Sequence, residues 1–164
     1  MTLPEQERER FCQVLHHSRT SLYRLAFSIT RNSSDAQEAV AEAVCRAYER
    51  YPQLREKEKL PRWLLKITAN EARRLCQRRG RTVALDDLPT EPATPGRETG
   101  DDTLWQAVQT LPRDQREAVV LFYYEDLPTE EIARIVGTSP GAVRVRLSRA
   151  REKLRSILKE GDYG

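Results

Sequence analysis

The chain has few of the residues from which covalent frameworks and reactive centres are built. Its 164 residues include only three cysteines and two histidines. Cys12, Cys45 and Cys76 are odd in number, far apart and outside any C-x-x-C pair, which argues against a disulfide framework or a zinc site. Each falls in a helical pattern, where we expect a small buried apolar residue. The histidines, His16 and His17, are adjacent, and we predict no metal, no cofactor and no catalytic acid–base pair.

Long apolar segments are also missing. No run of about 18 apolar residues is present, and the first residues, MTLPEQERERF, are too charged for the apolar core of a signal peptide. We therefore expect a cytoplasmic protein with no direct membrane insertion. Hydrophobic residues make up 38% of the chain and charged residues 32%. This balance suits thin helical bundles better than a thick α/β core, so the expected fold class is all-α.

The charge is distributed unevenly, although the net charge is only +3. Residues 61–81 hold seven basic side chains against one acidic, and residues 141–164 hold seven against three. By contrast, residues 82–102 hold one basic side chain against six acidic, and residues 103–140 hold three against six. Two basic segments separated by an acidic connector indicate two separate contacts with polyanions.

Segment 82–102 divides the chain into two parts. It is rich in Pro, Thr, Gly and acidic residues and lacks apolar periodicity, which is typical of a linker. We expect it to be flexible, so that the two parts have no fixed mutual arrangement in the free protein. The predicted domains are an N-terminal helical bundle, 1–81, and a C-terminal helix-turn-helix domain, 103–164. Each is small enough to need support from a partner.

Apolar residues at three- and four-residue steps predict three helices before the linker. The clearest covers 35–51, where Ser34 and Gln37 supply a capping-box start. An apolar stripe within 11–29 is compatible with packing against it. A third helix is expected over 61–79, with a proline as its first residue.

The most informative segment is TEEIARIVGTSPGAVRVRLSRAREKL, which covers 129–154. Thr129 is expected to cap a short helix, and Ala133 and Gly137 have the four-residue spacing of a helix-turn-helix. Ser139 is expected to cap a second helix that starts at Pro140. The predicted buried seam of this second helix consists of Val143, Leu147, Ala150 and Leu154.

Four arginines flank that seam on the second helix. A recognition helix enters the major groove with its N-terminal part, where arginine can bind a guanine edge through two hydrogen bonds. We predict that Arg144 and Arg146 read bases and that Arg149 and Arg151 contact the backbone. A solvated basic helix face is the alternative.

A second basic helix is predicted in WLLKITANEARRLCQRRGR, residues 63–81. Its polar residues form one stripe at i, i+3, i+4 and i+7, which can follow a phosphate backbone and bond the bases of a separated strand. Trp63 either stacks on a base or belongs to the core. The arginines at the helix end are compatible with a merely solubilising role. The stripe consists of Asn70, Arg73, Arg74 and Gln77.

A third surface is the outer face of the helix 35–51. It combines acidic and small residues, and taken alone it is compatible with plain solvent surface. Its members are Gln37, Glu38, Ala41, Glu42, Cys45 and Arg46.

Three segments together resemble the extracytoplasmic-function (ECF) sigma factors of the sigma-70 class, in the family's order and spacing. SDAQEAVAEAVCRAYERY is similar to the core-polymerase-binding helix, and WLLKITANEARRLCQRRGR is similar to the helix for the minus-10 element. LPRDQREAVVLFYYEDLPTEEIARIVGTSPGAVRVRLSRAREKLR is similar to the minus-35 module. The resemblance implies a transcription initiation factor, not an enzyme, which binds core RNA polymerase, directs it to promoters and helps melt the minus-10 region.

The resemblance also implies a role for each part. Domain 1–81, sigma region 2, would dock on the coiled coil of the polymerase's largest subunit through Gln37, Glu38, Ala41 and Glu42. Its stripe of Asn70, Arg73, Arg74 and Gln77 would contact the minus-10 element. Domain 103–164, sigma region 4, would lie near the flap tip and bind minus-35 DNA through Ser139, Arg144, Arg146, Arg149 and Arg151. The family usually has Gln-Glu where Ala41 and Glu42 stand here. An anti-sigma factor is an expected further partner.

Two other functions remain open from the residues alone. A helix-turn-helix repressor or activator that binds operators as a dimer would explain 103–164, but it would leave the basic helix at 63–81 without a role. A nucleic-acid-modifying enzyme would need a metal cluster or a paired acid and base, for which the two adjacent histidines are poor candidates.

Overall fold

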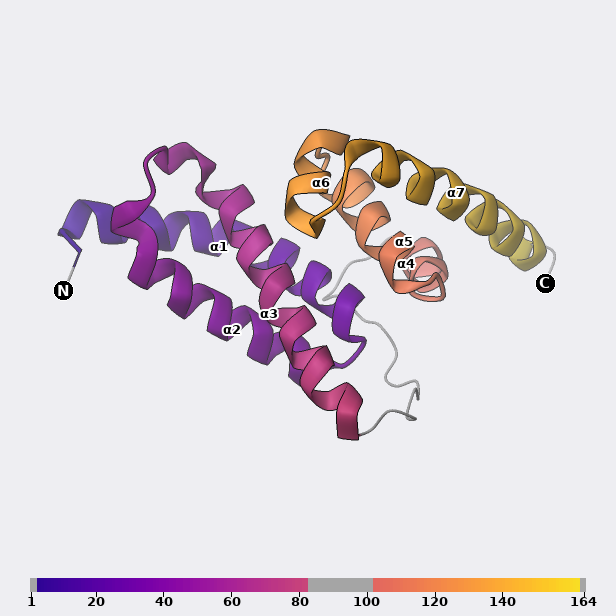
Figure 1. The fold of residues 1–164 in the computed structure, drawn as a ribbon, viewed down its shortest axis with the longest axis horizontal. Coiled ribbons are helices and arrows are strands. Elements are labelled where there is room, and N and C mark those ends of the chain that lie inside the picture. Colours follow the sequence, from indigo (N-terminus) through magenta and orange to yellow (C-terminus); the bar gives the residue numbers. More distant parts are fainter. Residues whose placement is uncertain (1–2, 83–101, 163–164) are drawn as a thin grey trace.

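The computed structural model describes residues 3–82 and 102–162, whose regular secondary structure is all helical, with no strand among them. The N-terminal unit consists of α1 (Glu5–Thr30), α2 (Ser33–Arg50) and α3 (Leu60–Thr82), with short 3-10 turns η1 (Tyr51–Gln53) and η2 (Lys57–Lys59) before α3. The C-terminal unit consists of α4 (Asp102–Gln109), α5 (Arg113–Val119), the π-helical turn η3 (Val120–Tyr124), α6 (Thr129–Val136) and α7 (Pro140–Asp162). The predicted all-α fold is confirmed (Figure 1).

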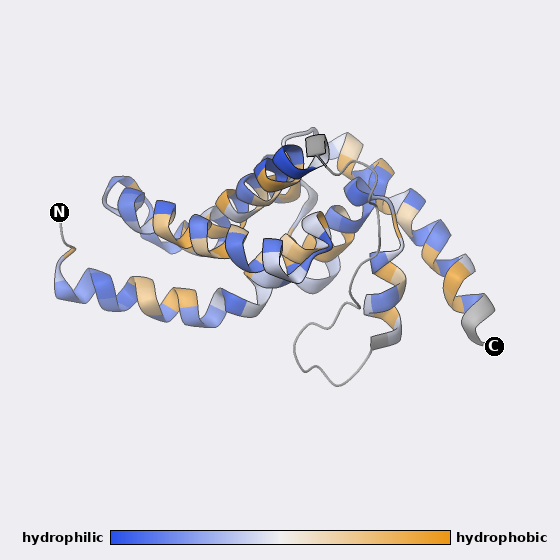
Figure 2. Cartoon of the chain, turned by 90° about the horizontal axis from the view of Figure 1, so that it is seen from below, coloured by the Kyte–Doolittle hydropathy of each residue, from blue (hydrophilic) through white to orange (hydrophobic). Residues whose placement is uncertain are grey.

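The N-terminal unit is a three-helix bundle in which each helix packs against the other two. Hydrophobic and hydrophilic residues alternate around each helix, as the periodicity predicts (Figure 2). Alanines on the inner side of α2 allow its neighbours to approach closely, and larger side chains of α1 and α3 fill the remaining space. The fully buried residues include Ala36, Ala39, Ala43 and Ala47 of α2, Leu22 and Leu25 of α1, and Leu64 and Ala69 of α3.

Two predicted helix caps are wrong. The side chain of Asn32, not Ser34, caps α2, because its Oδ1 accepts a hydrogen bond from the backbone N–H of Asp35 at 2.9 Å. Ser34 is the second residue of the helix, within its first turn, and is exposed. Thr129 is the first residue of α6 rather than its cap, and Pro128 stands at the cap position without a side-chain bond.

The C-terminal unit is built around the inner side of α7. The predicted seam is confirmed, since Val143, Leu147 and Ala150 are almost wholly buried and Leu154 packs against the same cluster. α5 and α6 both contact α7, and α4 adds Trp105 and other apolar residues. This packing fixes the outward direction of the remaining α7 side chains.

The two units pack against each other in the structure, and the expected absence of a fixed mutual arrangement stays a prediction. α5 and η3 lie against α1, and α6 lies against α3. The physical reason is a set of contacts between complementary charges, including Arg73 with Glu117 and Arg24 with Glu125. The central part of the predicted linker, 83–101, lies outside the described residues.

Candidate nucleic-acid and polymerase interfaces

The turn between α6 and α7 has the geometry of a helix-turn-helix. Gly137 ends α6 in the left-handed region, with φ of 76°, and its N–H donates to the Ala133 carbonyl at 2.8 Å. Non-glycine residues rarely adopt this conformation. Ser139 caps α7 as predicted, because its Oγ accepts from the Ala142 N–H at 3.1 Å. The turn therefore fixes where the N-terminal end of α7 begins.

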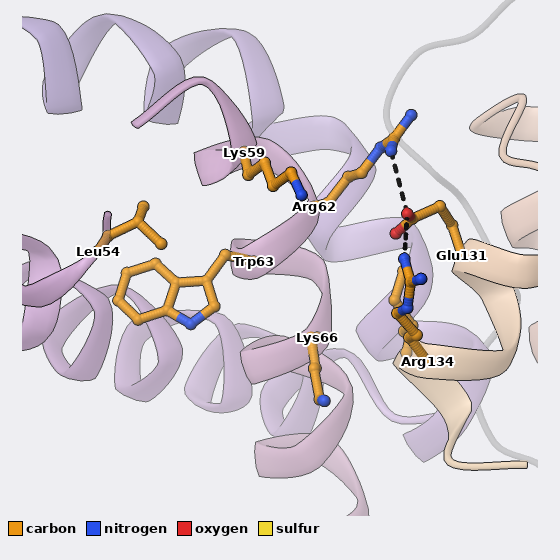
Figure 3. A pocket seen from close by; sticks show the side chains of 8 residues that line it. Leu54, Lys59, Arg62, Trp63, Lys66, Glu131 and Arg134 are labelled. Carbon is orange, nitrogen blue, oxygen red and sulfur yellow. Dashed lines mark hydrogen bonds and ion pairs between the residues drawn. The ribbon is translucent and has the colours of Figure 1, made fainter. Parts of the chain in front are cut away.

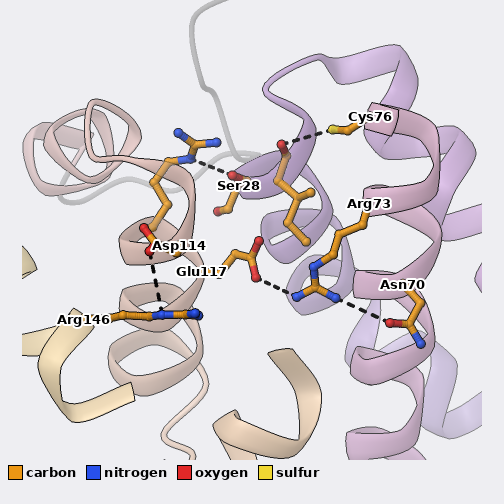
Figure 4. A network of polar contacts seen from close by, with 9 residues as sticks. Ser28, Asn70, Arg73, Cys76, Asp114, Glu117 and Arg146 are labelled. Carbon is orange, nitrogen blue, oxygen red and sulfur yellow. Dashed lines mark hydrogen bonds and ion pairs between the residues drawn. The ribbon is translucent and has the colours of Figure 1, made fainter. Parts of the chain in front are cut away.

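The predicted recognition residues on α7 differ in exposure and in their contacts with other side chains. Arg144 and Arg149 are exposed, as expected. Arg146 is only 26% exposed, and its Nε lies 3.8 Å from a carboxylate oxygen of Asp114 on α5 (Figure 4). Arg151 is exposed, but its Nε donates to the Tyr123 hydroxyl at 2.6 Å. The structure thus leaves Arg144 the freer of the two predicted base readers.

Val145 is a further member of this face, one that the sequence pattern did not predict. Val145 lies between the two predicted base readers and is 48% exposed, one of two large hydrophobic side chains exposed to this degree among the described residues. An apolar side chain on a recognition helix can contact the methyl group of thymine. Its position between two arginines was the available signal, but an isolated valine in an amphipathic helix does not reveal its direction.

On α3 one of the four side chains of the predicted minus-10 stripe is bonded to the C-terminal unit. Asn70, Arg74 and Gln77 are exposed, whereas the Arg73 side chain is only 26% exposed. Arg73 donates to Glu117 of α5 at 2.7 Å and to Asn70 Oδ1 at 3.4 Å (Figure 4). Arg74 forms an ion pair with the buried Glu71 one turn earlier, at 3.3 Å. The four side chains lie together along α3, but one of them is bound by the other unit.

A pocket of about 300 Å³ lies where the start of α3 meets α6. Its wall carries four basic side chains and one acidic, Glu131, which bonds Arg62 at 3.2 Å and Arg134 at 2.6 Å (Figure 3). Trp63 is half-buried, packing against the core while also lining this pocket. The core interpretation of the indole is therefore partly met, and stacking on a base stays a prediction. The other basic residues of the wall are Lys59 and Lys66.

The outer face of α2 presents the predicted polymerase-binding residues to solvent. Gln37, Glu38, Ala41 and Glu42 are all exposed. Arg46, at the edge of this face, pairs with Glu71 of α3 at 2.7 Å and therefore contributes to the bundle. The exposed face keeps its acidic character through Glu38 and Glu42.

The prediction of three buried cysteines is wrong for two of them. Cys12 and Cys45 are exposed, and Cys76 is half-buried. Small residues at the border of an apolar stripe can lie on either side of it, which the periodicity does not resolve. The Cys76 thiol donates to the Ile29 carbonyl at 3.5 Å, and burial raises its pKa. Among the described residues no three His, Cys, Asp or Glu side chains gather as a metal site would require.

Arg116 is the most deeply buried cation described at the contact between the units. Its Nε donates to the Ser28 carbonyl of α1 at 2.6 Å, and its Nη1 donates to the Leu111 carbonyl at 2.8 Å. Burial, together with the nearby positive charges of Arg31 and Arg113, lowers the pKa of Arg116 to about 10. The guanidinium is therefore still charged at neutral pH. The residue types do not predict this role, because the partners of Arg116 are backbone carbonyl groups, which every residue has.

Comparisons with known proteins cover both units. The sigma-70 region 2 family matches residues 14–82, and the sigma-70 region 4 family matches residues 101–154. No helix among the described residues is long and apolar enough to cross a membrane. The match over 14–82 accounts for the segment that a stand-alone helix-turn-helix repressor leaves without a role.

Individual relatives agree with these matches. RNA polymerase sigma factor SigV of Bacillus subtilis is 32% identical over 142 residues, which cover 85% of this chain and 86% of SigV. ECF RNA polymerase sigma factor SigE of Mycolicibacterium smegmatis is 35% identical over 84% of this chain, which spans only 57% of SigE. A solved structure of the sigma factor RpoE in complex with the anti-sigma factor NepR from Bartonella quintana superposes with a TM-score of 0.75. It has 26% identity and covers 95% of this chain and 98% of RpoE. The chain belongs to the extracytoplasmic-function family of RNA polymerase sigma factors.

Proposed function

We propose that the chain divides promoter recognition between two helices, α7 for the minus-35 duplex and α3 for the minus-10 strand as it separates. The observation that carries this proposal is the exposure of Arg144 near the start of α7, after the turn at Gly137, with Arg149 exposed farther along the same helix. An arginine near the start of such a helix reaches base edges in an intact major groove. Ser139, Arg146 and Arg151 complete the proposed minus-35 surface.

The proposed minus-10 surface consists of Asn70, Arg73, Arg74 and Gln77. Amide and guanidinium groups along one helix can follow a backbone and bond unpaired bases, which duplex DNA does not expose. Residues 1–81 would thus form the region 2 domain and 103–164 the region 4 domain. The acidic segment between them, which repels phosphates, would lie along the polymerase instead of the promoter.

The exposed outer face of α2 is the proposed contact with core polymerase. Gln37, Glu38, Ala41 and Glu42 would meet the coiled coil of the largest subunit, while the region 4 domain lies near the flap tip. By analogy with RpoE, whose solved structure holds the anti-sigma factor NepR, we infer that an anti-sigma factor also controls this chain. We further propose that it acts in the cytoplasm and catalyses no reaction itself.

The test is transcription in vitro with the chain, core polymerase from the same organism and fragments of its genome. Transcripts that start at defined sites only when the chain is added would support the proposal. A stand-alone repressor would instead bind DNA tightly without polymerase and would start no transcript. The start sites would also supply the promoter sequences for the residue-level tests below.

A further inference from the structure

The contact between the two units joins cations of one to carboxylates of the other. We call the three ion pairs across it the clasp. All three cations belong to α1 or α3, and all three carboxylates belong to α5, α6 or the residues between them. The clasp consists of Arg73–Glu117 at 2.7 Å, Arg24–Glu125 at 3.1 Å and Arg62–Glu131 at 3.2 Å. It gives a role to the acidic excess of residues 103–140, which promoter binding does not explain.

Glu117 is the most deeply buried carboxylate of the clasp. Its side chain is only 4% exposed, so its carboxylate has left water and depends on Arg73 for its charge partner. The next residue toward the N-terminus, Arg116, donates to the Ser28 carbonyl of α1. Arg24 adds a second type of contact, because its guanidinium lies 5.3 Å from the centre of the Tyr124 ring. The units are therefore held by specific polar contacts.

The Arg73–Glu117 pair uses a side chain that the proposed function assigns to promoter DNA. A guanidinium binds a carboxylate and a phosphate with the same donor groups. Here those groups are bonded to Glu117 on one side and to Asn70 on the other. Arg73 cannot hold Glu117 and a DNA phosphate in the same geometry.

We propose that the C-terminal unit is an intramolecular competitor of promoter DNA, with the Glu117 carboxylate occupying the site on α3 that a minus-10 phosphate would take. In the free chain the clasp holds the C-terminal unit over the Arg73 side chain of α3. Separation of the units exposes Arg73. This inference rests on the proposed role of Arg73. When only a small fraction of the molecules is in the state that can bind a ligand, the apparent affinity for that ligand is lowered in proportion to the fraction.

The closed arrangement can be measured in the full-length free chain by energy transfer between two dyes. One dye is attached to the exposed Cys45 of α2 and the other to Ser156→Cys on the exposed side of α7, with Cys12→Ser and Cys76→Ser removing the other thiols. The clasp variant is E117Q/E125Q/E131Q, in which glutamine keeps nearly the same shape. The matched control, E49Q/E130Q/E152Q, removes the same charge from exposed positions.

Energy transfer should fall in the clasp variant and stay unchanged in the control. It should also fall in the parent protein at high salt, because screening weakens partly exposed ion pairs. Far-UV circular dichroism of the clasp variant should match the parent, showing that the helices remain folded. Unchanged energy transfer in a folded clasp variant would overturn the proposal.

Competition is then measured as binding to a short random-sequence single-stranded DNA pool, without polymerase. The clasp variant should bind at least about fivefold more tightly than the control variant, as expected when a minor open state becomes the major one. Adding Arg73→Gln to the clasp variant should abolish the gain. A gain that survives Arg73→Gln would contradict competition at this side chain.

Transcription by the holoenzyme separates failure of this inference from failure of the proposed function. If the units separate without a gain in DNA binding while Arg73→Gln still lowers transcript yield, Arg73 serves the promoter but the competition is wrong. If Arg73→Gln leaves the transcript yield unchanged, the proposed role of Arg73 is wrong, and the competitor inference fails with it.

Discussion

At the residue scale, Arg144 and Arg146 differ in how exposed their side chains are. Arg144 is exposed, whereas Arg146 is partly buried beside Asp114. We predict that Arg144→Ala relaxes base preference at one or two minus-35 positions, at a cost of about 1–3 kcal/mol per lost bidentate contact. Competition binding by the holoenzyme to a library of minus-35 sequences measures this. Arg155→Ala, an exposed site farther along α7, is the control and should weaken all sequences alike.

Val145 carries a different prediction because it offers no hydrogen bond. If its exposed side chain contacts a thymine methyl, replacing that thymine by deoxyuridine should weaken binding by the parent protein. Val145→Ala should bind the two DNAs equally. Scanning each minus-35 thymine in this way locates the contact, and a parent protein insensitive to every replacement would show that Val145 makes none.

The three cysteines should differ in reactivity. Cys12 and Cys45 are exposed, whereas burial raises the pKa of the Cys76 thiol and so lowers its thiolate fraction at neutral pH. Iodoacetamide followed by mass spectrometry should label Cys12 and Cys45 first, with Cys76 labelled rapidly only after denaturation. Equal labelling rates in the folded chain would contradict the described packing of α3.

The sequence predicts a structural feature well when the residues that form it are close together along the chain. The seam of α7 and the Ser139 cap follow from residue spacing, and the structure confirms both. The predicted cap of α2 is wrong because Asn32 and Ser34 are both good capping residues two positions apart. The Arg73–Glu117 pair joins residues 44 positions apart, so no local pattern reveals it.

At the element scale, the α6–α7 turn depends on one backbone conformation. A Cβ at Gly137 would meet no atom within 4 Å, so the cost of Gly137→Ala comes from its φ of 76° alone. We predict a loss of about 1–2 kcal/mol in unfolding free energy, measured by urea denaturation. Gly141→Ala is the matched control, because Gly141 lies inside α7 with room for a methyl group. It should cause no loss and up to about 1 kcal/mol of gain.

At the scale of the whole molecule, the outer face of α2 is free for a partner while α3 and α7 carry the basic side chains. Reversing charge at Glu38 and Glu42 to lysine should weaken binding to core polymerase without unfolding, because both side chains point away from the bundle core. Pull-down with core polymerase measures this, alongside the double reversal of Glu49 and Glu152 as the control. If core polymerase captured both variants equally, α2 would not be the docking helix.

The central claim is that α3 and α7 act on different parts of the promoter, and a promoter pre-melted at minus-10 tests it most directly. Transcript yield and permanganate reactivity would be compared on intact and pre-melted templates for Asn70→Ala, Gln77→Ala and Arg144→Ala holoenzymes. The account predicts that pre-melting restores much of the yield lost in the two α3 variants and leaves the altered minus-35 preference of Arg144→Ala in place. An Arg144→Ala defect confined to melting, or an Asn70→Ala change confined to minus-35 preference, would contradict it.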